Sequence, residues 1–252
     1  MRPIVERLNR LRERLDASFT RERRFSSDLA HEMRTPIAEA RMVADSAIKW
    51  PEEGGTEAWE AVSASIARME GVVQAMLQLA RLEQKVPENK AAQFPLLPLI
   101  AEVWRDHTDL AAERQLQLRL EVPEGAKVPG DRALWSHLLS NLLGNAAEYA
   151  DAGSEVVVSL EEGPASESPV LTVCNHASAI APEEIDHLFD RFWRADHSRS
   201  GDQHCGLGLA LARACAEATG MQLTATLGRD PSILKMRVSK ENAPDGKTDH
   251  PA

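Results

Sequence analysis

This chain of 252 residues is poor in aromatic residues and in cysteine, and each shortage narrows the possible classes of protein. Aromatic residues make up only 4% of the chain, which suits helical bundles packed with leucine, alanine and valine. The three cysteines form no CxxC pair, so the sequence predicts a reducing compartment with neither a disulfide framework nor a zinc site. No apolar run approaches the length of a membrane span, and no secretory signal is visible.

Two further absences concern charge and phosphate-binding motifs. The chain has 29 basic and 39 acidic residues, a net charge of −10, which argues against nucleic acid as a partner. It has no GxxxxGK[ST] pattern, which excludes a P-loop enzyme. Eight arginines fall within residues 1–24. Such a basic segment is typical of the cytoplasmic side of a membrane anchor, and a solvated charged helix is the alternative.

Apolar residues at heptad spacing predict one long helix over residues 4–49, ending near Trp50 because a proline follows. At about 100° per residue, His31 points away from the apolar seam of this helix. Glu32 lies beside His31, where a carboxylate can hold the tautomer of the ring or accept its proton. Thr35 follows one turn later, and Pro36 removes a backbone donor and bends the helix.

A second helix is predicted to extend to about residue 85 after a turn at residues 52–56. Two long helices joined by a short loop form an antiparallel hairpin. One hairpin cannot bury both apolar stripes, so two hairpins are expected to form a dimeric four-helix bundle. The stripe of the second helix is Val62, Ile66, Met69, Val73, Met76 and Ala80.

Beyond a hinge-like linker at residues 86–90, helical and strand periodicities alternate, which predicts an α+β fold whose sheet carries helices on one face. The predicted domains are 1–20 as a signal-transmitting helix, 21–86 as the helical bundle, 92–240 as the α/β domain and 241–252 as a disordered tail. The predicted helices are 96–112, 131–150, 182–189 and 206–219, and the predicted strands are 116–122, 156–160, 170–174, 222–227 and 233–238.

The helix that Asp131 is expected to cap has one apolar and one polar face. Its predicted inward side chains are Leu138, Leu142, Ala146 and Tyr149. Its polar side chains are His137, Asn141, Asn145 and Glu148. Taken alone, two asparagines on one polar face are also compatible with plain surface residues. Further along, the glycines of residues 206–208 allow backbone to approach a phosphate at the start of a helix.

These stretches together resemble the sensor histidine kinases of two-component systems, and the region from about 15 to 240 carries the resemblance. Residues 25–37 resemble the H-box, Phe-x-x-Asp-x-x-His-Glu-x-x-Thr-Pro-aliphatic. Residues 141–149 resemble the N-box, 188–196 the F-box, 205–210 the G2 box and 175–180 a degenerate G1 box. The resemblance implies a dimerisation and phosphotransfer bundle followed by an ATP-binding α/β sandwich of the Hsp90 and gyrase type, closest to heavy-metal sensor kinases.

The resemblance also implies roles for individual residues. His31 would be phosphorylated from Mg-ATP with help from Glu32, and the phosphoryl group would pass to an aspartate of a response regulator. Thr35 would orient water for a phosphatase reaction, and Asn145 would bind Mg²⁺. A membrane anchor upstream would place this region in the cytoplasm. The implied nucleotide contacts come from Asn141, Asn145, Tyr149, Asn175, Ile180, Phe189, Arg194, Gly206, Leu207 and Gly208.

Several positions depart from the family pattern. Asn175 replaces the usual aspartate that accepts the adenine amino group, so this hydrogen bond loses its charge assistance. Ala177 and Ala179 replace glycines, His204 replaces the first glycine of the G2 box, and Glu148 stands where a basic residue is usual. A kinase-deficient nucleotide-binding scaffold or a phosphatase-dominant relative is therefore an alternative. An ATP-driven clamp like Hsp90 is another, but it leaves the H-box unexplained.

Overall fold

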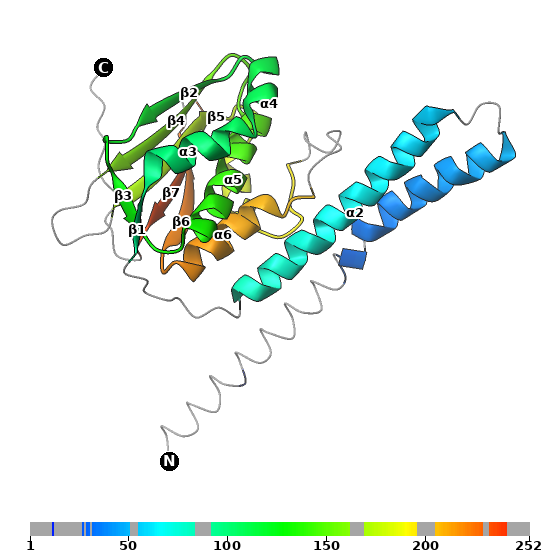
Figure 1. Cartoon of the computed structure of the whole chain (residues 1–252), viewed down its shortest axis with the longest axis horizontal. Coiled ribbons are helices and arrows are strands. Elements are labelled where there is room, and N and C mark those ends of the chain that lie inside the picture. Colours follow the sequence, from blue (N-terminus) through cyan, green and yellow to red (C-terminus); the bar gives the residue numbers. More distant parts are fainter. Residues whose placement is uncertain are drawn as a thin grey trace. The chain divides into compact units, whose positions relative to one another are not determined.

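The computed structural model describes most of the chain in two compact units, residues 1–73 and 74–252 (Figure 1). The described residues are 12, 27, 29–30, 32–50, 55–83, 92–161, 169–195, 205–228 and 232–240. The predictions for His31, the 86–90 linker, His204 and the 241–252 tail lie outside these residues.

The first unit contains most of the predicted helical hairpin. Its first helix runs through residues 32–49 and ends directly before Trp50, and Pro36 is buried within it. The second helix, α2 (Thr56–Glu83), starts after the loop and ends two residues before the predicted position. Arg68 and Glu39 join the two helices through an ion pair of 3.4 Å.

The apolar stripe of α2 is offset from the one that the heptad pattern predicts. Among the α2 residues of the first unit, Ser65 and Val72 are buried. Ile66 and Val73, one residue further on, are 46% and 44% exposed. Of the other predicted stripe residues, Met76 is buried and Val62, Met69 and Ala80 are partly buried, so the prediction is met in part within one hairpin.

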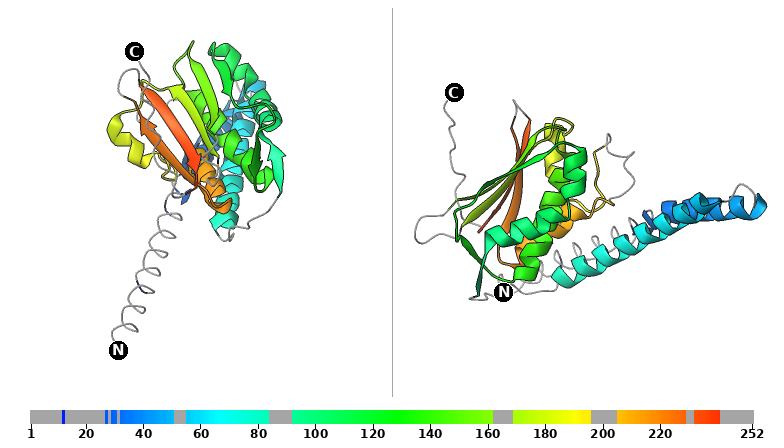
Figure 2. Two further views of the ribbon diagram at one scale, coloured as in Figure 1. Left: turned by 90° about the vertical axis from the view of Figure 1, so that its left-hand side faces the viewer. Right: turned by 45° about the horizontal axis from the view of Figure 1, so that its top comes forward.

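The second unit is built on a five-stranded sheet with the order β2-β4-β5-β7-β6. The strands β2 and β4 are parallel and the other neighbours are antiparallel. Figures 1 and 2 show the helices α3, α5 and α6 on one face of this sheet, as predicted. The strands are β2 (Gln117–Glu121), β4 (Glu155–Glu161), β5 (Val170–His176), β6 (Gln222–Leu227) and β7 (Ile233–Ser239).

The core lies between this sheet and the helices α5 (Arg132–Tyr149) and α6 (Gly208–Ala218). Apolar side chains in register form rows across the strands, of which Val158, Val173 and Met236 are one, all buried. Burial of such rows against a leucine-rich helix face is the main stabilising term for a domain of this size.

One helix near the start of the second unit differs from the sequence prediction. The single helix expected over 96–112 is two helices, α3 (Leu96–Arg105) and α4 (Thr108–Glu113). The break occurs because the backbone N–H of His107 (2.9 Å) and the hydroxyl of Thr108 (3.3 Å) both donate to the carbonyl of Trp104, closing a turn.

The structure also contains a small two-stranded sheet that the sequence analysis does not predict. It pairs β1 (Gln93–Pro95) with β3 (Lys127–Pro129). These strands are short and end at prolines, so they lack the alternation that marks longer strands. Phe94 packs edge-on against Trp135 with ring centroids 6.4 Å apart, which attaches this sheet to α5. The expected short helix at 182–189 is a 3₁₀ helix, η1 (Pro182–His187).

Candidate functional site

The helix α5 presents a polar face to a pocket and an apolar face to the core. Asp131 caps the helix as predicted, its carboxylate accepting from the N–H of Ala133 at 2.9 Å. Leu138, Leu142 and Ala146 are fully buried. The predicted inward position of Tyr149 is only partly met, because this side chain is half-buried and also lines the pocket.

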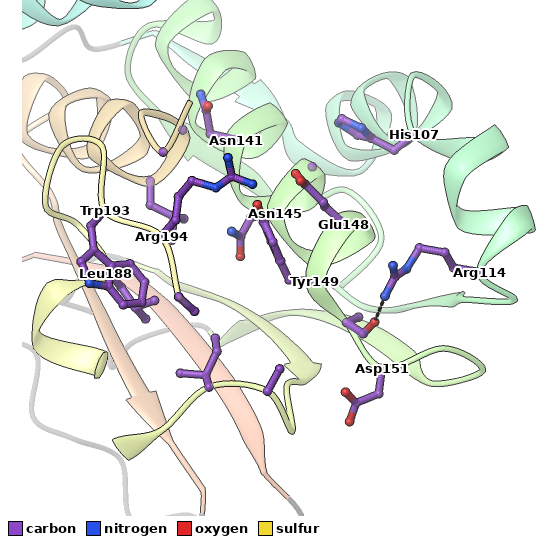
Figure 3. A pocket seen from close by; sticks show the side chains of 18 of the residues that line it. His107, Arg114, Asn141, Asn145, Glu148, Tyr149, Asp151, Leu188, Trp193 and Arg194 are labelled. Atoms are coloured by element: carbon purple, nitrogen blue, oxygen red, sulfur yellow. Dashed lines mark hydrogen bonds between the residues drawn. The ribbon is translucent and has the colours of Figure 1, made fainter. Parts of the chain in front are cut away.

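The pocket has a volume of about 790 Å³, which lies within the range of small-molecule and cofactor sites. It is formed by α5, the start of α6, the loop after β5, the segment after η1 and the α3–α4 turn (Figure 3). The predicted site residues that line it are Asn141, Asn145, Tyr149, Ile180, Arg194, Gly206 and Gly208.

Asn141 lies where α5 meets the first turn of α6. Its Nδ2 donates to the carbonyl of His137, one turn back, at 2.7 Å. A Cβ atom placed on Gly208 would lie 3.1 Å from Oδ1 of Asn141. The amide oxygen of Asn141 therefore faces the glycine that starts α6, and a larger residue at position 208 would displace it.

Gly206 has a backbone conformation that only glycine adopts without strain, with φ +68°. An added Cβ atom would lie 2.7 Å from the carbonyl oxygen of Trp193 and 2.9 Å from the carbonyl carbon of Phe192. The N–H of Phe192 donates to the carbonyl of Gly206 at 2.9 Å. This close approach joins the predicted F-box and G2 box and brings Arg194 to the pocket wall.

The loop after β5 carries Ala177 and Ala179 where the family pattern has glycines. Neither alanine is among the described non-glycine residues with positive φ, so the alanines fit without strain. The carboxylate of Asp151 accepts from the N–H of Ser178 at 3.2 Å and from its hydroxyl at 2.8 Å. Asp151 thus connects this loop to the end of α5.

Glu148 and Tyr149 are neighbours at the C-terminal end of the polar face of α5. Burial, the negative charge of Glu148 and a hydrogen bond to Glu148 raise the pKa of Tyr149 to about 12, although Arg194 acts in the opposite direction. The Tyr149 hydroxyl therefore stays protonated at neutral pH.

Three predicted contact residues do not line the pocket. Asn175 faces the helices between Val156 and Leu234 of the neighbouring strands, is 1% exposed, and donates through Nδ2 to the carbonyl of His176 at 3.1 Å. Phe189 packs under the guanidinium of Arg213, 5.8 Å from the ring centroid. Leu207 is buried in the core at the N-cap of α6. The motif spacing predicted where these residues lie along their elements. It could not predict that neighbouring elements cover their side chains.

Several residues that the sequence analysis missed also line the pocket. His107 covers Gly144, where an added Cβ atom would lie 3.0 Å from its ring. Arg114 donates to the carbonyl of Ala150 at 2.5 Å and so closes the end of α5. Trp193, Asp151 and Ser178 complete this group. Trp193 and Ser178 lie within stretches that the motifs mark, whereas His107, Arg114 and Asp151 come from turns with no pattern of their own.

The residues around the predicted phospho-acceptor are described only in part. His31 itself lies outside the described residues. Glu32 and Thr35 belong to the helix over residues 32–49, and Thr35 is exposed. The chain continues as helix through Pro36, so the proline does not end it.

A mixed sheet covered on one face by helices, with a pocket built from an asparagine face and a glycine turn, defines an α/β sandwich with a small-molecule site. The profile "Histidine kinase-, DNA gyrase B-, and HSP90-like ATPase" matches residues 130–249. The profile "His Kinase A (phospho-acceptor) domain" matches residues 21–85. The chain belongs to the histidine kinase family and carries the phospho-acceptor and ATPase domains of a transmitter region.

Individual relatives agree with this membership. The sensor histidine kinase CusS of Escherichia coli is 34% identical over 222 residues, which cover 85% of this chain and 45% of that protein. The sensor protein CopS of Pseudomonas syringae is 29% identical over 82% of this chain and 42% of its own length. The chain spans about half the length of the curated relatives it matches. The histidine kinase AdeS of Acinetobacter baumannii has the same fold, with a TM-score of 0.68 at 22% identity over 84% of this chain and 98% of that one.

No helix among the described residues is both long and apolar enough to cross a membrane.

Proposed function

We propose that this chain is the transmitter region of an ATP-dependent protein-histidine kinase, which phosphorylates His31 and passes the phosphoryl group to an aspartate of a response regulator. The observation that carries this proposal is one pocket that gathers Asn141, Asn145 and the glycine turn at the start of α6. The same chain carries a histidine followed by Glu32 and Thr35 on a long helix.

The pocket suits a nucleotide because its two ends differ in chemistry. At one end, α6 starts at Gly208 with no side-chain cap from Leu207, so its first N–H groups can donate hydrogen bonds to phosphate oxygens. Arg194 adds a positive charge to the wall. At the other end, Tyr149 and Ile180 provide apolar surface for a base. The three predicted contact residues that do not line the pocket would support its wall from behind; they are Asn175, Phe189 and Leu207. That Asn175 also contacts adenine directly stays a prediction.

Mg²⁺ fits the ligand set of this pocket, since the amide oxygen of Asn145 is a hard oxygen ligand. Among the described residues, no group of three histidine, cysteine or acidic side chains forms a separate metal site. The bound ion would neutralise charge on the phosphates. Asn145 would hold the ion, and Asn141 would lie beside the phosphates.

Phosphoryl transfer requires a nucleophile and an acceptor for its proton. A ring nitrogen of His31 would form a bond to the γ-phosphorus as the bond to the bridging oxygen breaks and ADP leaves. Glu32 would accept the proton that the imidazole loses. In the next step an aspartate oxygen of the regulator takes the phosphoryl group and restores His31. Thr35, exposed one turn further on, would orient water for the reverse dephosphorylation of the regulator.

The partners of this chain follow from the outer face of the hairpin. The exposed Ile66 and Val73 would pack against the same face of a second copy, giving a homodimer. The histidine kinase ThkA was solved in complex with the response regulator TrrA, and it shares this fold with a TM-score of 0.64 at 17% identity over 86% of this chain and 61% of that one. We place the region in the cytoplasm, attached to a membrane anchor upstream.

The test of this function is incubation of the purified chain with γ-labelled ATP and Mg²⁺. The expected product is a phosphoprotein whose label is lost in acid and kept in base, as for phosphohistidine. Nucleotide binding without any label would contradict the kinase assignment and favour the scaffold alternative. ATP turnover without phosphohistidine would favour the clamp.

A further inference from the structure

The pocket contains a carboxylate at a position where a nucleotide would bring negative phosphates. Glu148 lines the pocket from the same face of α5 as Asn145, three residues earlier, and Asn141, seven residues earlier. Figure 3 shows its carboxylate directed into the space between Asn145 and His107. A carboxylate so placed repels a bare polyphosphate.

Glu148 lies among other residues of the pocket wall. His107 packs on Gly144, one helical turn before Glu148, and closes the wall beside the carboxylate. The other acidic residue of the wall, Asp151, is engaged by the N–H and hydroxyl of Ser178. Of the two acidic residues that line the described wall, Glu148 is the one on the same face of α5 as Asn145.

We propose that Glu148 is a second protein ligand of the divalent cation, acting with Asn145, so that the pocket accepts the nucleotide only as its metal complex. The inference rests on the proposed nucleotide site. Residues three apart on a helix have Cβ atoms about 5–6 Å apart, which lets two side chains reach one ion. Magnesium is commonly held by one or two carboxylates together with phosphate oxygens and water.

The two possible roles of Glu148 predict opposite effects of removing its charge. If Glu148 binds the cation, Glu148→Gln weakens binding of the metal–nucleotide complex and tightens binding of the bare nucleotide. If Glu148 only repels phosphates, the same change tightens both. The ratio of the two affinities therefore separates the roles.

The experiment is calorimetric titration of the chain with ADP, with Mg²⁺ and with a chelator, at one ionic strength. For Glu148→Gln we expect the preference for the metal complex to fall by about tenfold or more. Glu148→Lys should bind metal-free ADP more tightly still and lose most of its metal preference. Asp151→Asn is the matched control, because it removes another carboxylate of the same wall, and its metal preference should equal that of the parent.

Each result has a defined meaning. An unchanged metal preference in Glu148→Gln, or tighter binding of both forms of ADP, overturns the proposed ligand role. An equal change in Asp151→Asn also overturns it, because a general field effect would then account for the data. If the parent fails to bind ADP under any condition, the proposed function of the pocket fails instead.

Discussion

At the scale of single residues, the pocket depends on a helix that puts amides and a carboxylate on one face and leucines on the other. Asn145 is half-buried at the pocket, whereas Leu142 and Ala146 are fully buried in the core. Because the two faces are separate, polar residues can be changed without disturbing the packing. Substitutions on the polar face therefore report on ligand binding rather than on folding.

Asn145→Ala should reduce binding of Mg-ADP while leaving thermal unfolding unchanged. Hydrogen bonds to charged groups contribute about 1.5 to 3 kcal/mol, which corresponds to about a 10- to 150-fold loss of affinity. Calorimetry with Mg-ADP measures the loss, and His137→Ala, exposed on the same helix, serves as control. Equal affinities of the parent and Asn145→Ala would remove Asn145 from the site.

Tyr149 is the only tyrosine of the chain, so its ionisation can be followed by absorbance. The midpoint should lie near 12 in the folded protein and near 10.0 in denaturant. Since the folded pKa is the higher one, the stabilisation by neutral Tyr149 is complete below pH 10 and is lost as the pH rises towards 12. Glu148→Gln should lower the midpoint only in part, because burial is the largest cause of the shift. If the titration midpoint lies near 10 while the circular dichroism spectrum still shows a folded protein, Tyr149 is not in the buried environment described here.

At the scale of elements, the backbone geometry of the glycine turn before α6 restricts which residues can occupy position 206. Gly206→Ala should destabilise the α/β unit by about 3 kcal/mol or more, because it adds a backbone clash to the cost of a left-handed conformation. Gly125→Ala is the matched control, since Gly125 has φ +79° and nothing within 4 Å of the added atom. Its cost should be only about 1–2 kcal/mol.

Urea unfolding of these two variants separates the clash from the conformational cost. Equal losses of unfolding free energy would show that the contact of Gly206 with Phe192 and Trp193 contributes nothing.

Elements with long periodic patterns could be predicted, and those set by tertiary contacts could not. The helix capped by Asp131 and the strands from β4 onward lie within a few residues of their expected bounds. The break at His107 depends on a turn that no periodicity marks, and it brings a histidine to the pocket wall. Motif spacing likewise found Asn145 and Gly208 but not Arg114, which reaches the pocket from a separate turn.

At the scale of the whole molecule, the hairpin exposes apolar side chains that a single copy leaves in water. Val73→Asp should weaken the dimer by about 1.5 to 3 kcal/mol per chain, because each chain of a symmetric pair loses the burial of one valine. Sedimentation at a series of concentrations measures the change, and Gln74→Asp, exposed next to it, is the control. A parent that is monomeric at every concentration, or a variant as dimeric as the parent, would contradict the proposed interface.

If the ATP-binding domain and the helical hairpin together phosphorylate His31, replacing this histidine removes the phosphohistidine but leaves nucleotide binding intact. The parent, His31→Gln and the control His187→Gln are incubated with γ-labelled Mg-ATP, and the label is quantified beside ADP affinity. We predict acid-labile label in the parent and in His187→Gln, and none in His31→Gln, with the same ADP affinity in all three. Acid-labile label that persists in His31→Gln would contradict the account, because another residue would then be the acceptor.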